Sequence, residues 1–369
     1  FGSSHSGSSS RSGGDSPPRR PRQQWAMAAG AMEDLARDED PKVLMCGTQR
    51  AGKTSILKVV FSKLAPHETQ FVLSTQKVEV TVARNPMVSF KVVDLCPSYI
   101  FDETTDAMLL SNTGVVVIVI DAQEDVYLEG LVLARKNIEV ALKVNSKISF
   151  DILVHKVDGN HFFVDERGAE IQRDIQSKLS EELHDKTAQM SFHCTSIYDH
   201  TIFEAFSKIV QKLIPQLPAL EQCLDLLISH SRMEKAYLFD IRSKVYIAST
   251  PQPVDTHSYE LCSDMIDVLV EVSCIYGQQE ELMRMHRYDS LLNSTDESCP
   301  KRSCVISLND GSLLYLREID SCLALVCILR EENFDRRHLL EHNIMVFTEA
   351  LAAIFRVSPG SPSSTASSS

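Results

Sequence analysis

The sequence has no apolar run long enough to cross a membrane and no cysteine spacing typical of a metal site. Its longest apolar run, Gly114 to Ile120, falls far short of the roughly 20 residues that a membrane-spanning helix needs. Its ten cysteines include no Cys-x-x-Cys pair, and Cys299 and Cys304 lack a second pair of ligands to complete a zinc site. We therefore expect no direct membrane insertion, no structural metal, and reduced core cysteines in an intracellular protein.

The sequence also lacks an excess of basic residues. Its formal net charge is -13, which argues against a general affinity for nucleic acid. A content of 43% hydrophobic and 24% charged residues is typical of a globular protein, and 369 residues are enough for two domains. We expect two folded domains and no nucleic-acid partner.

Both ends of the chain have little apolar periodicity. Residues 1–40 are rich in Ser, Gly, Pro and Arg, and residues 358–369 are rich in Ser. Such segments cannot bury enough apolar surface to fold on their own, so we expect two disordered tails. The basic cluster from Pro17 to Arg22 could contact an acidic lipid or a partner, although a solvated tail is the simpler interpretation.

Residues 41–217 alternate short apolar runs with amphipathic stretches, which is the pattern of a doubly wound α/β domain. The run Val115–Asp121 is nearly continuous in large apolar residues, as a strand covered on both faces requires. Pro215 and Pro218 interrupt helical continuation and mark the end of this domain. The expected strands are Lys42–Cys46, Lys77–Ala83, Val88–Asp94, Val115–Asp121, Phe150–His155 and Met190–Thr195. The expected helices are Lys53–Ser62, Glu129–Val144, Gly168–Leu183 and Thr201–Leu213.

Residues 218–357 predict a second domain of the α+β class. We expect a hairpin of Ala236–Ile241 with Lys244–Ala248, followed by a helix at Ser258–Ile275. An antiparallel meander and a closing helix should follow, at Cys304–Leu308, Leu313–Glu318, Leu323–Leu329 and Phe334–Phe355. Helices on one face of such a sheet leave an edge or a face to cover, so this domain is expected to dimerise.

The segment Gly47-Thr48-Gln49-Arg50-Ala51-Gly52-Lys53-Thr54 has the spacing G-x-x-x-x-G-K-[ST] of a phosphate-binding loop, directly after a strand and before a helix. In such a loop the backbone amides and the helix N-terminus donate hydrogen bonds to phosphates, and Lys53 adds a cation between them. The Thr54 hydroxyl would bind magnesium. We expect the nucleotide to contact Gly47, Gln49, Arg50, Ala51, Gly52, Lys53, Thr54 and Ser55.

A carboxylate stands at the end of a later strand. Asp94 follows the phosphate loop by about 40 residues, where a carboxylate can hold magnesium through a water molecule. A cap at the end of the strand is the alternative interpretation of this residue. The phosphate loop upstream favours the metal role.

The segment His155-Lys156-Val157-Asp158 ends another expected strand and predicts the base. A carboxylate at Asp158 can accept hydrogen bonds from the ring N–H and the exocyclic amine of guanine, which adenine cannot offer in that arrangement. The aliphatic stem of Lys156 would lie along the base, and Ser196 and Ile197 would close over its other side. The pattern therefore predicts GTP and GDP as ligands.

These motifs resemble the Rag GTPases, and the RagC/RagD type more than the RagA/RagB type. The resemblance covers about Pro41 to Val357 and is carried by His155–Gly159, Thr195–Lys208, Val210–Pro218 and Ser258–Gly277. It implies a P-loop (Ras-like) GTPase domain followed by a roadblock/longin-like C-terminal domain, and an obligate heterodimer with a RagA/RagB-like partner. It further implies a cytoplasmic protein that a scaffold complex recruits to the lysosomal or vacuolar membrane. There it would signal amino-acid sufficiency to the target-of-rapamycin kinase complex, with slow GTP hydrolysis.

The resemblance also adds two residues to the expected site. His155 replaces the asparagine that is commoner in G proteins, as it does in this family. Ser74-Thr75 matches the family's first switch, whose threonine senses the γ-phosphate and magnesium. Without the resemblance, a generic polar turn would be the preferred interpretation of Ser74-Thr75. The expected metal ligands are Thr54, Thr75 and Asp94.

The chain departs from this family at the second switch. The family carries Asp-Phe-Pro-Gly-Gln there, whereas this chain reads Asp94-Leu95-Cys96-Pro97-Ser98. The family's glycine donates its N–H to the γ-phosphate, but Pro97 has no N–H, and Ser98 is too short to orient an attacking water as glutamine does. Loss of one charge-assisted hydrogen bond, about 1.5–3 kcal/mol, would lower the preference for GTP over GDP by roughly tenfold or more.

Two other functions stay open at this point. A pseudo-GTPase scaffold would act mainly through heterodimerisation, with hydrolysis impaired by Pro97 and Ser98, unless another loop geometry restores the lost contacts. A P-loop kinase or other ATPase is disfavoured, because Asp158 follows Lys156 at the base-reading strand and the sequence has no Arg-rich segment that resembles a lid.

Overall fold

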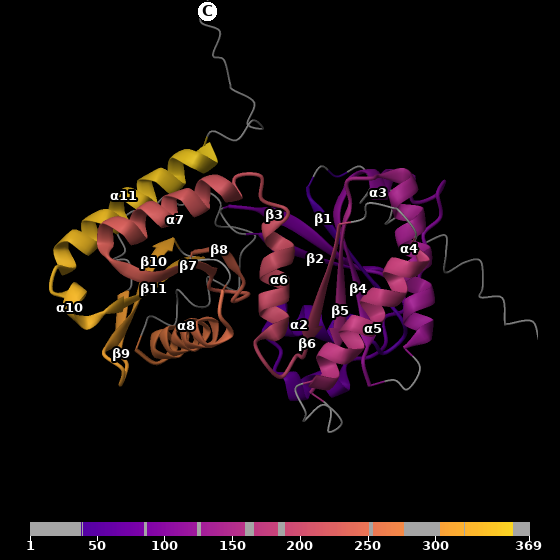
Figure 1. The fold of residues 1–369 in the computed structure, drawn as a ribbon, viewed down its shortest axis with the longest axis horizontal. Coiled ribbons are helices and arrows are strands. Elements are labelled where there is room, and N and C mark those ends of the chain that lie inside the picture. The colour runs from indigo at the N-terminus through magenta and orange to yellow at the C-terminus, as the bar shows by residue number, and fades with distance from the viewer. Residues whose placement is uncertain are drawn as a thin grey trace, which may run out of the picture.

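The computed structural model describes residues 38, 40–84, 87–123, 127–158, 166–183, 189–250, 254–276, 303–320 and 322–356. These residues form two β-sheets with helices around them, and one helix, α6 (Thr201–Gln211), lies between the two units (Figure 1). The predictions for the two tails fall outside the described residues, apart from residues 38 and 40. The domain boundary expected at residue 217 stays a prediction.

The N-terminal sheet has six strands in the order β2-β3-β1-β4-β5-β6. All neighbouring pairs are parallel except β2 with β3 at the edge. The strands are β1 (Lys42–Gly47), β2 (Glu79–Arg84), β3 (Ser89–Asp94), β4 (Thr113–Asp121), β5 (Ser149–His155) and β6 (Gln189–Thr195). Besides α6, the helical segments are α2 (Lys53–Ser62), the 3-10 segment η1 (Pro66–Phe71), α3 (Ala107–Ser111), α4 (Leu128–Val144) and α5 (Glu166–Glu182). The expected strands and helices of this domain are confirmed with small shifts at their ends.

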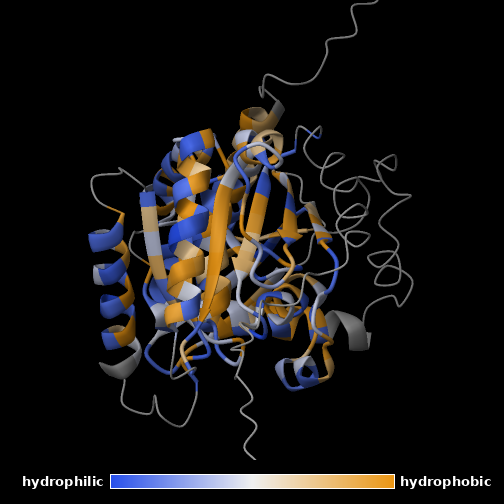
Figure 2. Ribbon diagram, turned by 90° about the vertical axis from the view of Figure 1, so that its right-hand side faces the viewer, coloured by the Kyte–Doolittle hydropathy of each residue, from blue (hydrophilic) through white to orange (hydrophobic). Residues whose placement is uncertain are grey.

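The central strand β4 is buried on both faces. Val117 packs in a hydrophobic cluster with residues of α2 and α6, whereas the next residue, Ile118, packs in a second cluster with residues of α4 and α5. Figure 2 shows the consequence as strands of nearly continuous hydrophobic colour beside helices that alternate between hydrophilic and hydrophobic residues. Burial of each such side chain stabilises the fold by about 1.5–3 kcal/mol, which fixes β4 beside β1, the strand that leads into the phosphate-loop motif.

The C-terminal sheet has five antiparallel strands in the order β8-β7-β11-β10-β9. Counted within the domain, this is the order 2-1-5-4-3, and it agrees with the expected roadblock/longin-like architecture. The strands are β7 (Met233–Asp240), β8 (Tyr246–Thr250), β9 (Ser303–Ser307), β10 (Ser312–Asp320) and β11 (Leu323–Arg330). The helices are α7 (Leu217–Ser231), α8 (Thr256–Tyr276), α10 (Glu331–Phe334) and α11 (Arg337–Arg356).

The expectation that helices cover one face of this sheet is wrong. Leu325 of β11 packs in the cluster that contains α7 and α11, whereas its neighbour Val326 packs in the cluster that contains α8. Figure 1 accordingly shows α7 and α11 on one side of the strands and α8 on the other. The run Leu323–Leu329 is apolar at successive positions, and this is the sequence signal of a strand covered twice.

Two helix boundaries in this domain also differ from the sequence-based expectation. The closing helix, expected from Phe334, begins at Arg337 as α11, and a separate short helix, α10, ends at Phe334. Pro218 lies in the first turn of α7, where the N–H that proline lacks has no intrahelical partner in any case. Pro218 therefore starts a helix as well as ending the preceding segment.

Helix α6 connects the two units. Phe206 and Ile209 belong to a hydrophobic cluster that extends from α2 of the first unit to Leu224 and Ala236 of the second. The Ser207 hydroxyl accepts a hydrogen bond of 3.0 Å from the backbone N–H of Tyr246 in β8. The two units therefore share a core through this helix.

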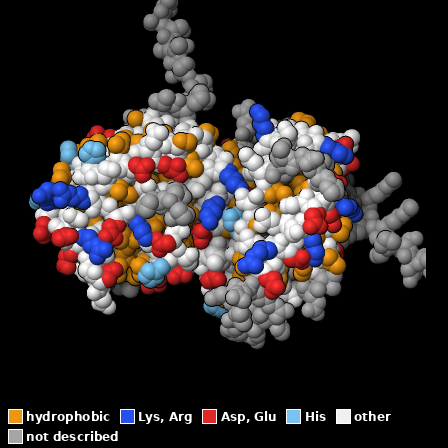
Figure 3. Space-filling model, viewed as in Figure 1, with side chains coloured by type: hydrophobic (Ala, Val, Ile, Leu, Met, Phe, Trp, Pro, Cys, Tyr) orange, Lys and Arg blue, Asp and Glu red, His pale blue; other side chains and the backbone are white. Residues whose placement is uncertain are grey.

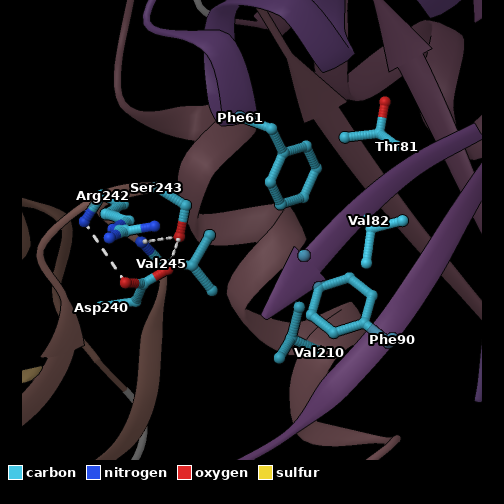
Figure 4. A pocket seen from close by; sticks show the side chains of 10 residues that line it. Phe61, Thr81, Val82, Phe90, Val210, Asp240, Arg242, Ser243 and Val245 are labelled. Atoms are coloured by element: carbon cyan, nitrogen blue, oxygen red, sulfur yellow. Dashed lines mark hydrogen bonds between the residues drawn. The ribbon is translucent and has the colours of Figure 1, made fainter. Parts of the chain in front are cut away.

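A cavity of about 120 Å³ lies at the same junction (Figure 4). Phe61, Phe90 and Val210 form its apolar wall, and Asp240 and Ser243 lie opposite, joined by a hydrogen bond of 2.6 Å from the Ser243 hydroxyl. Burial raises the pKa of Asp240. The cavity lies at the C-terminal end of α2, whereas the phosphate loop lies at the N-terminal end of that helix, so the cavity is separate from the expected nucleotide site.

The surface carries charged side chains of both signs. On the face shown in Figure 3, acidic and basic side chains of the described residues are interspersed. Within the part of the chain that the structure describes, no helix combines the length and apolarity needed to span a bilayer.

Candidate nucleotide-binding site

The phosphate-loop motif forms the turn between β1 and α2. A β-carbon on Gly47 would lie 2.5 Å from the carbonyl oxygen of Val119 in β4, and a β-carbon on Gly52 would lie 2.7 Å from Cδ2 of His155. Gly52 also has a φ of 103°, which residues with a side chain rarely adopt. Both glycines are therefore required by the close approach of neighbouring strands.

Lys53 lies inside this loop. Its side chain is 5% exposed, and its Nζ donates to the carbonyl oxygens of Gly47 at 3.0 Å and Thr48 at 3.1 Å. Desolvation lowers the pKa of Lys53, and the charge of Asp94 opposes that effect. An anion bound in the loop would compensate the desolvated ammonium group.

Thr54, Thr75 and Asp94 come together beside the loop. Thr54 Oγ1 donates to Asp94 Oδ2 at 2.5 Å and lies 2.5 Å from Thr75 Oγ1, which is 3.3 Å from the same carboxylate oxygen. The other oxygen, Asp94 Oδ1, is buried and has no hydrogen-bond partner among the described residues. Burial raises the pKa of Asp94, and the hydrogen bond from Thr54 opposes this shift.

This arrangement fits a magnesium ion. Two hydroxyl groups and a carboxylate form a set of hard oxygen donors, which Mg²⁺ prefers. A cation or its bound water would also satisfy the orphaned Asp94 oxygen and keep the buried carboxylate ionised. Thr54, Thr75 and Asp94 are the residues that would hold the ion.

The expected base-reading residues face one another across two loops. Asp158 follows β5 and is exposed, and its Oδ1 accepts a hydrogen bond of 2.7 Å from the Ser196 hydroxyl after β6. Ser196 is fully buried, and its backbone N–H donates to Thr201 Oγ1 at 2.9 Å at the start of α6. Ile197 is half-buried and packs against the core beside α6. The carboxylate is thus oriented by a fixed neighbour and still accessible to a base.

Lys156 connects the expected base-reading segment to the phosphate-loop motif. Its Nζ donates to the carbonyl oxygen of Arg50 at 2.8 Å and to Asp121 Oδ2 at 2.5 Å. Both Lys156, with a φ of 66°, and Arg50, with a φ of 63°, adopt the left-handed conformation. We did not expect Asp121 at this site from the sequence, although its position at the end of β4 could have indicated it.

His155 lies beneath the loop. Its ring is 1% exposed, and Nδ1 lies 3.0 Å from Thr195 Oγ1. Burial lowers the pKa of His155 to about 4, with a smaller contribution from the charge of Lys156. The ring is therefore neutral at physiological pH, and it packs against Gly52 instead of carrying a charge.

The other expected residues differ in their exposure. The side chains of Gln49 and Arg50 are exposed, Ala51 is fully buried, and Ser55 is half-buried in α2. All the segments that carry the expected residues, including Thr75 before β2, meet at the edge of the sheet where β1, β3, β5 and β6 end. This edge of an open α/β sheet is where such folds bind their ligands.

Comparisons with known proteins agree on one family. The conserved region of Gtr1/RagA G proteins matches residues 42–266. Ras-related GTP-binding protein C of Homo sapiens is 44% identical to this chain over 330 residues, which cover 87% of this chain and 78% of that protein. GTP-binding protein gtr2 of Schizosaccharomyces pombe is 41% identical over 319 residues, which cover 85% of this chain and 98% of that protein.

Similarity to the other branch is lower. Ras-related GTP-binding protein A of Dictyostelium discoideum is 28% identical over 240 residues, which cover 61% of this chain and 75% of that protein. The higher identity and the longer match to protein C and gtr2 confirm the resemblance to the RagC/RagD type. The chain therefore belongs to the Gtr1/RagA family of G proteins, in the branch of Ras-related GTP-binding proteins C and D and of gtr2.

Proposed function

We propose that this chain is the guanine-nucleotide-binding subunit of a Rag-type heterodimer, with GTP or GDP held at the sheet edge described above. The observation that carries the proposal is the contact between loops that are distant in sequence. Lys156 reaches the Arg50 carbonyl of the phosphate loop, and Ser196 orients the Asp158 carboxylate. These contacts support the proposal because they join the loop after β1 to the segment after β5, and the segment after β5 to the segment after β6.

Each residue has a distinct proposed role. The backbone from Gly47 to Ser55 and the ammonium of Lys53 bind the phosphates. Asp158 accepts the guanine N–H groups, while the Lys156 stem and Ser196–Ile197 enclose the base. Thr54, Thr75 and Asp94 hold magnesium, which supplies positive charge against the phosphate oxygens. The His155 ring packs against Gly52 and so fixes the position of the loop.

The proposal extends to partners. The relatives of this chain include Rag proteins of both branches, so we propose a heterodimer with a RagA/RagB-like protein, formed through the C-terminal domain. We further propose that the heterodimer is recruited by a scaffold complex to the lysosomal or vacuolar membrane and signals amino-acid sufficiency to the target-of-rapamycin kinase complex. In such a switch, partners bind the two nucleotide states with different affinity.

Nucleotide selectivity tests the core of this proposal. The chain would be co-purified with a RagA-like partner whose own phosphate-loop lysine has been substituted, so that nucleotide binding reports this chain alone. Its affinity for GDP, GTP, ADP and ATP would be measured with and without magnesium. We expect submicromolar binding of the guanine nucleotides only, followed by slow hydrolysis of GTP in single-turnover assays. Equal affinity for adenine and guanine nucleotides, or binding of none of the four, would exclude the proposed function.

A second candidate function is favoured by the residues at the second switch. Pro97 lacks an N–H, and Ser98 replaces the family's glutamine, so hydrolysis could be impaired altogether. The chain would then be a pseudo-GTPase scaffold that acts mainly through heterodimerisation. Single-turnover hydrolysis separates the two functions: a measurable rate favours the switch, and none favours the scaffold.

A further inference from the structure

The segment after Asp94 is fastened to the phosphate loop. The backbone N–H of Ser98 donates to the carbonyl oxygen of Gly47 at 3.0 Å, and that of Leu95 donates to Met45 at 3.1 Å. Ser98 has a φ of 54°, a left-handed conformation that is uncommon for a residue with a side chain. Such a conformation persists only where the surrounding structure holds it.

The same segment is anchored to α4 by one buried amide. The Asn137 side chain is fully buried; its Oδ1 accepts from the Phe101 N–H at 3.0 Å, and its Nδ2 donates to the Tyr99 carbonyl at 2.9 Å. Phe101 itself is 3% exposed and packs in the core. Release of this segment from α4 would leave buried polar groups without hydrogen-bond partners, so it is unfavourable.

A third anchor lies at the end of the segment. The Asp106 carboxylate accepts hydrogen bonds from the Tyr99 hydroxyl at 2.9 Å and from the Asp102 N–H at 2.9 Å. Asp106 is 3% exposed. Residues 94–106, which we name the second-switch strap, are thus fixed at the phosphate loop, at α4 and at Asp106.

The strap offers no free backbone donor at the two positions of its tip. Pro97 has no N–H, and the N–H of Ser98 is committed to Gly47. We propose that the strap keeps one conformation in both nucleotide states. Because neither Pro97 nor Ser98 has a free N–H, the site binds the two phosphates that GDP and GTP share but does not detect the γ-phosphate through the second switch. The inference rests on the proposed nucleotide binding and specifies it, because sensing of the third phosphate is left to Thr75.

The equilibrium test compares affinities for GDP and for a slowly hydrolysed GTP analogue in the full chain, paired with the partner whose phosphate-loop lysine has been substituted. We expect the unaltered chain to bind both with similar affinity. Pro97→Gly restores an N–H and should raise the ratio of GTP-analogue to GDP affinity roughly tenfold, the effect of one charge-assisted hydrogen bond. Pro215→Gly is the matched control. Pro215 is exposed and follows the C-terminal end of α6, whereas the expected base site lies at the N-terminal end of that helix, so this substitution should leave the affinity ratio unchanged.

Hydrogen exchange tests the fixed strap directly. Amides of residues 95–106 should exchange equally in the GDP complex and in the GTP-analogue complex, and Asn137→Ala should accelerate their exchange. Asn145→Ala is the control, because the Asn145 side-chain amide donates to the carbonyl oxygen of Leu110 at 3.1 Å, outside the strap. If Asn137→Ala fails to fold, Pro97→Gly and the unaltered chain still decide the outcome.

The failures of the two proposals can be distinguished. A strong preference of the unaltered chain for the GTP analogue, or slower exchange of the strap in that complex, would overturn this inference alone. An unchanged affinity ratio both in Pro97→Gly and in Pro97→Gly combined with Asn137→Ala would also overturn it. If the folded chain binds neither nucleotide, the proposed function and this inference both fail.

Discussion

His155 lies directly against Gly52, so that a β-carbon on this glycine would approach the His155 ring to 2.7 Å at Cδ2 and 3.0 Å at Nε2. The contact joins the end of β5 to the phosphate loop. Gly52 immediately precedes α2, whose first N–H groups are the proposed phosphate ligands. The histidine ring therefore limits how closely the loop at Gly52 can approach the end of β5.

Gly52→Ala should weaken GDP binding strongly, because the new methyl group meets the His155 ring and the backbone at a φ of 103° disfavours any side chain. His155→Ala in addition should recover part of the affinity by removing the clash. The measurement is the GDP dissociation constant from fluorescence titration. Gly311→Ala is the control for strain alone, since Gly311 has a φ of 79° with no atom near its β-carbon position. Gly52→Ala with the affinity of the unaltered chain would contradict the assigned contact.

Asp158→Asn should shift the preference from guanine toward xanthine nucleotides. An asparagine amide can donate a hydrogen bond to the C2 carbonyl of xanthine, whereas the carboxylate accepts from the C2 amine of guanine. Competition between GDP and xanthosine diphosphate measures this shift. Asp310→Asn, at an exposed carboxylate in the β9–β10 turn, should change nothing. Unaltered guanine binding in Asp158→Asn would remove Asp158 from the base site.

Thr54→Asn should weaken binding of GTP in the presence of magnesium more than binding without it. The substitution removes the hydroxyl that donates to Asp94 and that would contact the ion. Titrations of GTP with magnesium and with a chelator measure the difference within one variant, so the chelated sample is the internal control. An equal loss under both conditions would mean that Thr54 supports the loop only through packing.

Stability should fall below neutral pH because of His155. Its pKa is lowered by burial to about 4 in the folded chain, against about 6.5 in an unfolded chain. The unfolded state therefore binds more protons between these values, so the contribution is complete above pH 6.5 and is lost as the pH falls toward 4. Between about pH 7.5 and pH 5, the free energy of unfolding should fall by about 2 kcal/mol because of this residue.

Urea unfolding at the two pH values measures this effect. His155→Asn removes the titrating group and should reduce the loss of stability on acidification by that amount. Other buried groups such as Asp94 titrate in both proteins, so the difference between them isolates the histidine. An identical pH dependence in the two proteins would show that His155 is solvated in the folded state.

The regular elements of the fold could be predicted from sequence because their signals are local. The Gly47–Thr54 motif, the continuous apolar residues of Val115–Asp121 and the amphipathic stretch at Lys53–Ser62 each carry their structure within a few residues. The second layer of the C-terminal sheet was missed although its signal is equally local, in the run Leu323–Leu329. The error came from expecting a sheet with one covered face.

The anchors of the site could not be predicted in the same way. Asn137 contacts Tyr99 and Phe101 from a helix that follows them by more than thirty residues, and nothing in its own neighbourhood distinguishes it from a solvated helical asparagine. The bond from Lys156 to Arg50 joins residues separated by 106 positions. Such contacts depend on how strands are ordered in the sheet, and local periodicity does not contain that order.

Helix α6 gives the chain a mechanical link between assembly and ligand release. Its first turn follows Ser196, which holds Asp158, and its middle carries Phe206 and Ser207, which pack on or bond to the C-terminal unit. A protein that tilts the C-terminal sheet would pull on the helix that directly follows Ser196 and Ile197, the residues proposed to enclose the base. On the proposed function, a protein bound only to the C-terminal unit would accelerate the exchange of nucleotide without contacting the nucleotide itself.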